Sequence, residues 1–155
     1  AYAAIANGGV AIKPTLLKRD GPTTGVRVMS EKTAMEAVKM LRRVVTEGTA
    51  SLGEVPGYEV AGKTGTADKP KKSGGYYDDK VVNTFASMFP ASNPQYVLIV
   101  TLDEPVDTTM SETRRTAGWT VVPVAAEIIR RVAPLMGLRP KLEPPAVDAV
   151  TAASN

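Results

Sequence analysis

The stretch YEVAGKTGTA, residues 58–67, decides the fold of this chain of 155 residues. It is typical of a strand that ends in the tetrad Lys63, Thr64, Gly65 and Thr66. Because strand side chains alternate between two faces, Thr64 and Thr66 share one face, where their hydroxyls can bind one carboxylate. Alternation points Lys63 to the other face, so either its long side chain curls round the strand or the strand twists there to bring its charge near. Gly65 leaves room for a second backbone to approach and pair with the strand, and the Thr66 N–H is free to donate to a developing oxyanion.

Two further strands are expected after the tetrad. Residues 82–89 carry strand signals, and residues 96–102 form a continuous aliphatic run that suits a central strand buried on both faces. Residues 68–80, rich in Lys, Gly and Asp, predict a mobile loop between the tetrad strand and the next one. Successive strands with short or looped connections pair most simply as an antiparallel sheet.

Helices are predicted on both sides of these strands. Ser30 has the chemistry of an N-cap, and apolar residues recur at helical spacing from Ala34 to Val45 before Gly48. A last helix is expected to begin near Thr120 and to end before Gly137. These elements predict an α+β fold, an antiparallel sheet with helices packed on it.

Residues 1–137 are expected to form one unit, followed by a disordered tail over residues 138–155, which are rich in Pro and Ala. Residues 1–9 read as the last turns of a helix stopped by Asn-Gly-Gly. A natural protein seldom begins inside a helix without methionine, so we expect the chain to be a fragment of something longer.

Composition excludes several chemistries. The chain contains no His and no Cys, which removes Ser-His-Asp triads, Cys-His dyads and the usual zinc sites. We expect no metal and no cofactor. The positive charge, +3 in total, is spread out and lacks an accompanying nucleic-acid motif, so no nucleic acid partner is expected. No run of 18 apolar residues occurs in the sequence.

The segment from Val60 to Ala67 resembles the Lys-Thr-Gly box of penicillin-binding proteins, the D,D-transpeptidases that cross-link peptidoglycan. The resemblance continues in chain order through residues 2–9, 44–50, 85–90, 102–105 and 116–124. The order and spacing of these segments are similar to those of the class B, monofunctional branch. The sequence of the C-terminal segments is most similar to the cell-division (septal) type of a proteobacterium.

This resemblance implies a partial penicillin-binding/β-lactamase-like transpeptidase fold. It implies that Lys63 supports the proton network and the local positive field. Thr64 and Thr66 would bind the terminal carboxylate of D-Ala-D-Ala or of a β-lactam, Gly65 would allow close approach, and Thr66 would also lend its N–H to the oxyanion hole. Implied partners are peptidoglycan stem peptides, β-lactams and other cell-division or wall-synthesis proteins. The implied location is the periplasmic side of the bacterial inner membrane, through an anchor outside this chain.

The chain departs from the family pattern at the nucleophile. The family uses Ser-x-x-Lys and Ser-x-Asn, and none of the seven serines begins either motif. We therefore expect one wall of an active site without the attacking group, and a chain that is inactive alone. The alternatives are another penicillin-recognising serine acyl enzyme, a β-lactamase or carboxypeptidase, and a non-catalytic penicillin-binding sensor. The Gly48-Thr49 turn and the Asp103-Glu104-Pro105 strand end argue against the first of these.

Overall fold

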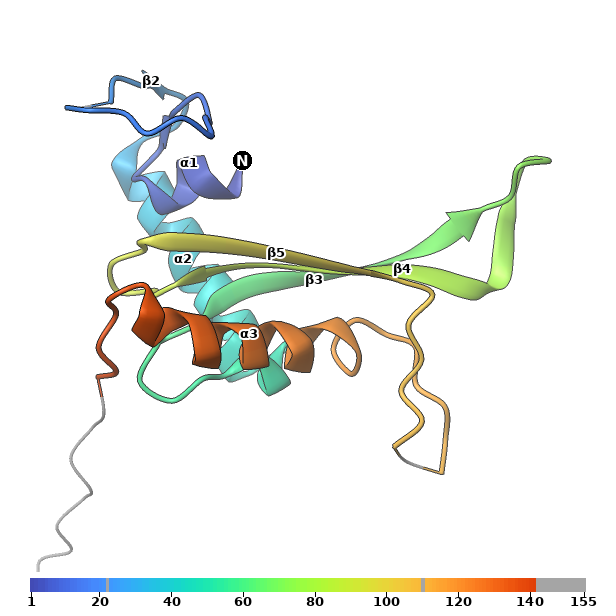
Figure 1. Ribbon diagram of the computed structural model, residues 1–155. Coiled ribbons are helices and arrows are strands. Elements are labelled where there is room, and N and C mark those ends of the chain that lie inside the picture. The colour runs from blue at the N-terminus through green and yellow to red at the C-terminus, as the bar shows by residue number, and fades with distance from the viewer. Residues whose placement is uncertain (22, 110, 142–155) are drawn as a thin grey trace, which may run out of the picture.

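A three-stranded antiparallel sheet forms the centre of the computed structural model, which describes residues 1–21, 23–109 and 111–141. The strands are β3 (Ala61–Pro70), β4 (Tyr76–Phe89) and β5 (Tyr96–Asp103), in the order β3-β4-β5. The helix α3 (Val121–Leu135) lies along one face of this sheet (Figure 1). The predicted α+β architecture with an antiparallel sheet is confirmed.

The N-terminal elements begin on the side of the sheet away from α3, and α2 runs from there past the strands toward the main core (Figure 1). They are the short helix α1 (Tyr2–Ala6), the two-residue strands β1 (Val10–Ala11) and β2 (Val26–Arg27), which pair with each other, and the helix α2 (Glu31–Thr46). A 3-10 turn, η1 (Ser51–Gly53), connects α2 to β3. The chain therefore approaches β3 through α2 and η1, which both end near the tetrad.

The predicted N-cap of α2 is confirmed. The Ser30 hydroxyl accepts a hydrogen bond from the Thr33 N–H at 3.1 Å, which satisfies one of the free donors at the helix start. Glu31 in the first turn and Arg43 in the last both complement the helix dipole. Ala34, Val38 and Val45 are the buried positions, so the helix packs along the predicted apolar stripe.

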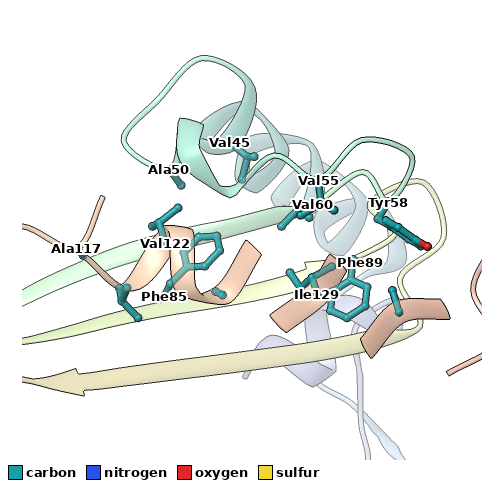
Figure 2. Close-up of a cluster of buried hydrophobic side chains, with 13 residues drawn as sticks. Val45, Ala50, Val55, Tyr58, Val60, Phe85, Phe89, Ala117, Val122 and Ile129 are labelled. Atoms are coloured by element: carbon teal, nitrogen blue, oxygen red, sulfur yellow. The ribbon is translucent and has the colours of Figure 1, made fainter. Parts of the chain in front are cut away.

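The main core lies between the sheet and α3 (Figure 2). Phe85 of β4 is fully buried on the face of the sheet that α3 covers. It belongs to the same core cluster as Val122 and Ile129 of that helix. Burying a side chain of this size contributes about 1.5–3 kcal/mol. A smaller cluster on the opposite face joins Met88 of β4 to α1 and to Val38 of α2. The two clusters hold α3 and α1 on opposite faces of the sheet.

Two strand predictions were wrong. The expected mobile loop over residues 68–80 is mostly the far end of the β3–β4 hairpin, which projects from the body (Figure 1). Lys69 bonds to Asp103 at 2.8 Å and to Glu104 at 2.7 Å, and Lys80 bonds to Glu104 at 2.9 Å, so polar residues of the predicted loop are used to join strands. The turn is confined to residues 71–75, where Gly74 and Gly75 both have positive φ.

The second wrong prediction concerns residues 96–102. The strand β5 lies at the edge of the described sheet, and β4 takes the centre. Ile99 of β5 is 56% exposed, whereas Phe85 and Met88 of β4 are fully buried. An aliphatic run without alternation does not reveal whether a strand has one neighbour or two, because that depends on strand order.

The expected disordered tail needs a correction at its beginning. Leu138 packs against the main core, and the Lys141 N–H donates to the Gly57 carbonyl at 2.9 Å. Residues 138–141 are therefore held against the body, and the rest of the expected tail, residues 142–155, lies outside the described residues. Within the described ranges, no helix is long and apolar enough to cross a membrane.

Candidate active-site wall

A pocket of about 390 Å³ opens beside the tetrad. Three segments form it: residues 48–52 after α2, Thr64 and Thr66 of β3, and residues 116–119 before α3. This cavity is called the threonine pocket below. The prediction that Thr64 and Thr66 share one face is confirmed, because both side chains line the same cavity.

Each threonine hydroxyl already has a partner in this pocket. The Thr64 Oγ1 atom lies 2.8 Å from the Thr49 Oγ1 atom, and either hydroxyl can be the donor. The Thr66 Oγ1 atom accepts a hydrogen bond from the Ala117 N–H at 3.0 Å. No residue in the described part of the chain accepts from the Thr66 hydroxyl, so its hydrogen can donate into the pocket. The geometry therefore presents the Thr66 hydroxyl as a donor toward an acceptor such as a carboxylate.

Glycines in and around the pocket have different reasons to be glycine. A Cβ at Gly118 would lie 2.6 Å from the Thr49 carbonyl, so two of the pocket segments could not pack together with a side chain there. A Cβ at Gly62 would meet the Ala86 carbonyl at 2.6 Å and the Phe85 ring at 2.7 Å, so Gly62 serves the core. At Gly65 the nearest atom would be the Thr84 carbonyl at 3.9 Å, an ordinary contact. The chain's own packing does not demand glycine at position 65.

Lys63 lies on the other face of β3, opposite Ala86 in the sheet register. Its exposed side chain curls round the strand, which is the first of the two alternatives that the sequence left open. The Nζ atom lies 2.7 Å from the Thr64 carbonyl oxygen and 3.5 Å from the Thr64 Oγ1 atom. The positive charge of Lys63 is therefore close to the Thr64 hydroxyl, although Lys63 does not line the threonine pocket itself.

The backbone of β3 has one side that pairs with β4 and another that pairs with no strand in the described part of the chain. The tetrad sits on this strand in perfect register with residues 83–86 of β4. An extended peptide can add to such an edge by backbone hydrogen bonds. The arrangement thus combines a strand edge, two hydroxyls and a nearby cation.

Sequence reasoning assigned no site role to the pocket residues outside β3, Thr49, Ala117 and Trp119 among them. Thr49 entered only through the Gly48-Thr49 resemblance. Trp119 is not a core residue. Its side chain is 44% exposed, and the Arg114 guanidinium stacks on it with 3.8 Å between Cζ and the ring centroid. No periodic signal marks these residues, because loops place them.

Ser51 also lines the threonine pocket. Glu54 stands three residues later, where a Ser-x-x-Lys motif would carry its lysine. The Glu54 carboxylate is paired with the Arg42 guanidinium. Ser51 therefore lacks the neighbouring base that would activate a serine nucleophile in this family of motifs.

A larger pocket of about 890 Å³ lies elsewhere, between α2, residues 54–59 and residues 91–92. Its charged groups already have partners. The bond to Glu54 raises the pKa of Arg42, which also donates to the Val60 carbonyl at 2.7 Å. The hydrogen bonds from Ser92 lower the pKa of Glu59. Size alone favours this pocket, but the two threonine hydroxyls and the strand edge lie at the threonine pocket, which we take as the candidate site.

Comparison with known proteins identifies the fold and the family. The model of the penicillin binding protein transpeptidase domain matches residues 1–130. The probable peptidoglycan D,D-transpeptidase FtsI of Caulobacter vibrioides is 35% identical over 151 residues, which cover 90% of this chain and 26% of that protein. Penicillin-binding protein PbpB of Mycobacterium tuberculosis is 41% identical over 122 residues, covering 67% of this chain and 18% of that protein.

Solved structures agree. The apo transpeptidase domain of Burkholderia pseudomallei penicillin-binding protein 3 has a TM-score of 0.79 at 36% identity, covering 92% of this chain and 42% of that one. Penicillin-binding protein 3 of Mycobacterium tuberculosis in complex with ampicillin has a TM-score of 0.76 at 31% identity, covering 94% and 35%. The chain thus spans about a quarter of the Caulobacter relative and less than half of each solved chain. It belongs to the penicillin-binding protein transpeptidase family, as part of the transpeptidase domain of a class B protein of the septal type.

Proposed function

We propose that the protein to which this chain belongs is a penicillin-sensitive D,D-transpeptidase that cross-links peptidoglycan by serine acyl transfer from D-Ala-D-Ala peptides. The single observation that carries the proposal is the pair Thr64 and Thr66, which present two hydroxyls to one pocket at a strand edge. The match of residues 1–130 to the transpeptidase domain supports it.

In this proposal, Thr64 and Thr66 bind the terminal carboxylate of the peptide, and Lys63 supplies positive charge and supports the proton network. A hydrogen bond to a charged acceptor is worth about 1.5–3 kcal/mol, and the Ala117 N–H orients Thr66 to make one. The packing of the chain leaves room for a Cβ at Gly65, and the glycine is consistent with a second backbone lying beside it. The Thr66 N–H would stabilise the oxyanion of the tetrahedral intermediate.

The attacking serine would come from a part of the protein outside this chain. Its oxygen would add to the carbonyl of the penultimate D-Ala and expel the terminal D-Ala, leaving an acyl-enzyme. The amine of a second stem peptide would then take the acyl group and release the serine. A β-lactam would acylate the same serine, with its carboxylate held by Thr64 and Thr66. The chain of residues 1–155 would supply only one wall and would be inactive alone.

The proposed partners are peptidoglycan stem peptides, β-lactams and other proteins of cell division or wall synthesis. The proposed location is the periplasmic side of the inner membrane, with the anchor elsewhere in the protein. The solved complexes of penicillin-binding protein 3 with ampicillin and aztreonam support β-lactams as ligands, and the relatives named as D,D-transpeptidases support an enzyme that acts on peptidoglycan.

A second function, β-lactamase or carboxypeptidase activity, uses the same wall, and a non-catalytic penicillin sensor would also bind the drug. The deciding experiment incubates the full-length protein with a fluorescent penicillin and with a pair of stem peptides. A transpeptidase forms a long-lived adduct and a cross-linked dimer. Rapid turnover of the penicillin would indicate a β-lactamase, and an adduct without a peptide product would indicate a sensor.

A further inference from the structure

Asn83 of β4 is fully buried and ties the sheet to the segment that closes the threonine pocket. Its Nδ2 atom donates to the Arg115 carbonyl at 2.6 Å and to the Thr120 Oγ1 atom at 2.7 Å. The Thr120 hydroxyl in turn donates to the Thr116 carbonyl at 3.1 Å. One amide group therefore holds both ends of residues 115–120.

The same segment is tied to β3 by a second bond. Asn83 stands directly opposite Thr66 in the β3–β4 register, and Thr66 accepts from the Ala117 N–H in the middle of the segment. Residues 115–120 are thus fastened to two neighbouring positions on adjacent strands. Ala117, Gly118 and Trp119, which line the pocket, lie between the fastened ends.

Stability alone does not explain an asparagine at the buried position 83. Asn is disfavoured in strands, and its Oδ1 atom is buried without a hydrogen-bond partner among the described residues. A buried polar atom without a partner costs about 1–3 kcal/mol. Two of its neighbours, the Arg115 carbonyl and the Thr120 hydroxyl oxygen, both accept, so the amide nitrogen must face them. The bonds from Asn83 to residues 115–120 therefore explain this residue better than the stability of the sheet does.

We propose that Asn83 is a positioning residue for the carboxylate site. It holds residues 115–120 so that the Ala117 N–H orients the Thr66 hydroxyl as a donor and the Trp119 side chain stays at the edge of the pocket. Asn83 itself touches no substrate. This inference rests on the proposed function, because it assigns the carboxylate to Thr66.

The test uses the full-length protein and measures its acylation by penicillin. Asn83→Asp preserves the shape but turns a donor into an acceptor facing the Arg115 carbonyl, and Asn83→Ser is too short to reach the segment. Each is expected to lower the second-order acylation rate constant about tenfold, mainly by weakening binding before acylation. Should Asn83→Asp not fold, Asn83→Ser carries the test.

Ser87→Ala is the matched control. Ser87 lies on the same strand and face, is equally buried, and donates to the Leu98 carbonyl of β5 at 2.9 Å. The substitution removes a buried hydrogen bond and leaves the bonds to residues 115–120 in place, so the variant should be acylated at the rate of the parent. A fall as large as that of Asn83→Ser would overturn the proposal, since the loss would then follow general destabilisation.

A double variant tests whether Asn83 acts through Thr66. In a Thr66→Val background, Asn83→Ser should lower the rate by less than about twofold, because the hydroxyl to be oriented is gone. Full additivity of the two losses would overturn the proposal.

Amide hydrogen exchange measures the positioning directly and does not depend on acylation. Exchange over residues 115–120 should become about tenfold faster in Asn83→Ser and stay unchanged in Ser87→Ala. Unchanged exchange in Asn83→Ser would overturn the inference. A parent protein that penicillin does not acylate would instead contradict the proposed function, and the exchange result would still decide whether Asn83 holds the segment.

Discussion

Replacing Thr66 by Val tests the carboxylate assignment most directly. Valine keeps the branched shape and the strand preference of threonine and removes only the hydroxyl. In the structure this hydroxyl accepts from the Ala117 N–H at 3.0 Å and has its hydrogen free for the pocket. The substitution therefore removes one proposed bond to the carboxylate and leaves one N–H of the pocket wall without its acceptor.

The two losses have separate magnitudes. A hydrogen bond to a charged carboxylate is worth about 1.5–3 kcal/mol, which corresponds to an acylation rate about ten- to a hundredfold lower. The stranded Ala117 N–H costs about 1–3 kcal/mol of stability, because Ala117 is buried. The backbone N–H of residue 66 survives, so the proposed oxyanion contact persists and the variant retains activity.

The assay is the second-order rate of acylation of the full-length protein by penicillin, with thermal unfolding as a control for folding. Thr66→Ser keeps the hydroxyl and should stay within about threefold of the parent rate, because only a methyl group is lost. Thr66→Pro removes the backbone donor and should be far slower than Thr66→Val. A folded Thr66→Val variant that acylates at the parent rate would refute the assignment of the carboxylate to this hydroxyl.

Three further outcomes follow from the structure. Ile129→Ala in the full-length protein should lower the free energy of unfolding in urea by about 2–5 kcal/mol, because Ile129 is fully buried in the main core; a loss below about 1 kcal/mol would contradict that packing. The Ser92 hydrogen bonds lower the pKa of Glu59 in the folded state, so their stabilisation is present above the ordinary pKa and is lost as pH falls through the lowered value. Glu59→Gln should accordingly reduce the loss of stability between about pH 5 and pH 3, and an unchanged pH profile would argue against this coupling. The chain of residues 1–155 alone should show no covalent penicillin adduct by mass spectrometry, and a stable adduct on any serine would disprove the expectation that it lacks the nucleophile.

Local chemistry was enough to predict the elements whose signals lie within a few residues. The Ser30 cap and the apolar stripe from Ala34 to Val45 predicted α2, since both depend only on helical periodicity. Alternation along β3 placed Thr64 and Thr66 on one face and Lys63 on the other, because the strand period is two. The hydroxyl pair of the candidate site was therefore visible in the sequence.

Partners distant in the chain decided the rest. Thr66 is hydrogen-bonded to Ala117, 51 residues later in the chain, and Thr64 to Thr49, 15 residues earlier. No local sequence pattern could predict either bond. The lysines at positions 69 and 80 were expected in a mobile loop, whereas the end of β5 brings Asp103 and Glu104 beside them.

Strand order likewise left β5 at the edge of the described sheet and buried Asn83 beneath the pocket segment. The local sequence pattern indicates the preferred backbone conformation and the face of the helix or strand on which a side chain lies. Which neighbour covers that face depends on how α3, the sheet and the connecting loops bury their apolar surfaces together. The hydroxyls of the site were thus readable from residues 63–66, whereas their orientation came only with the packing of residues 115–120 against two strands.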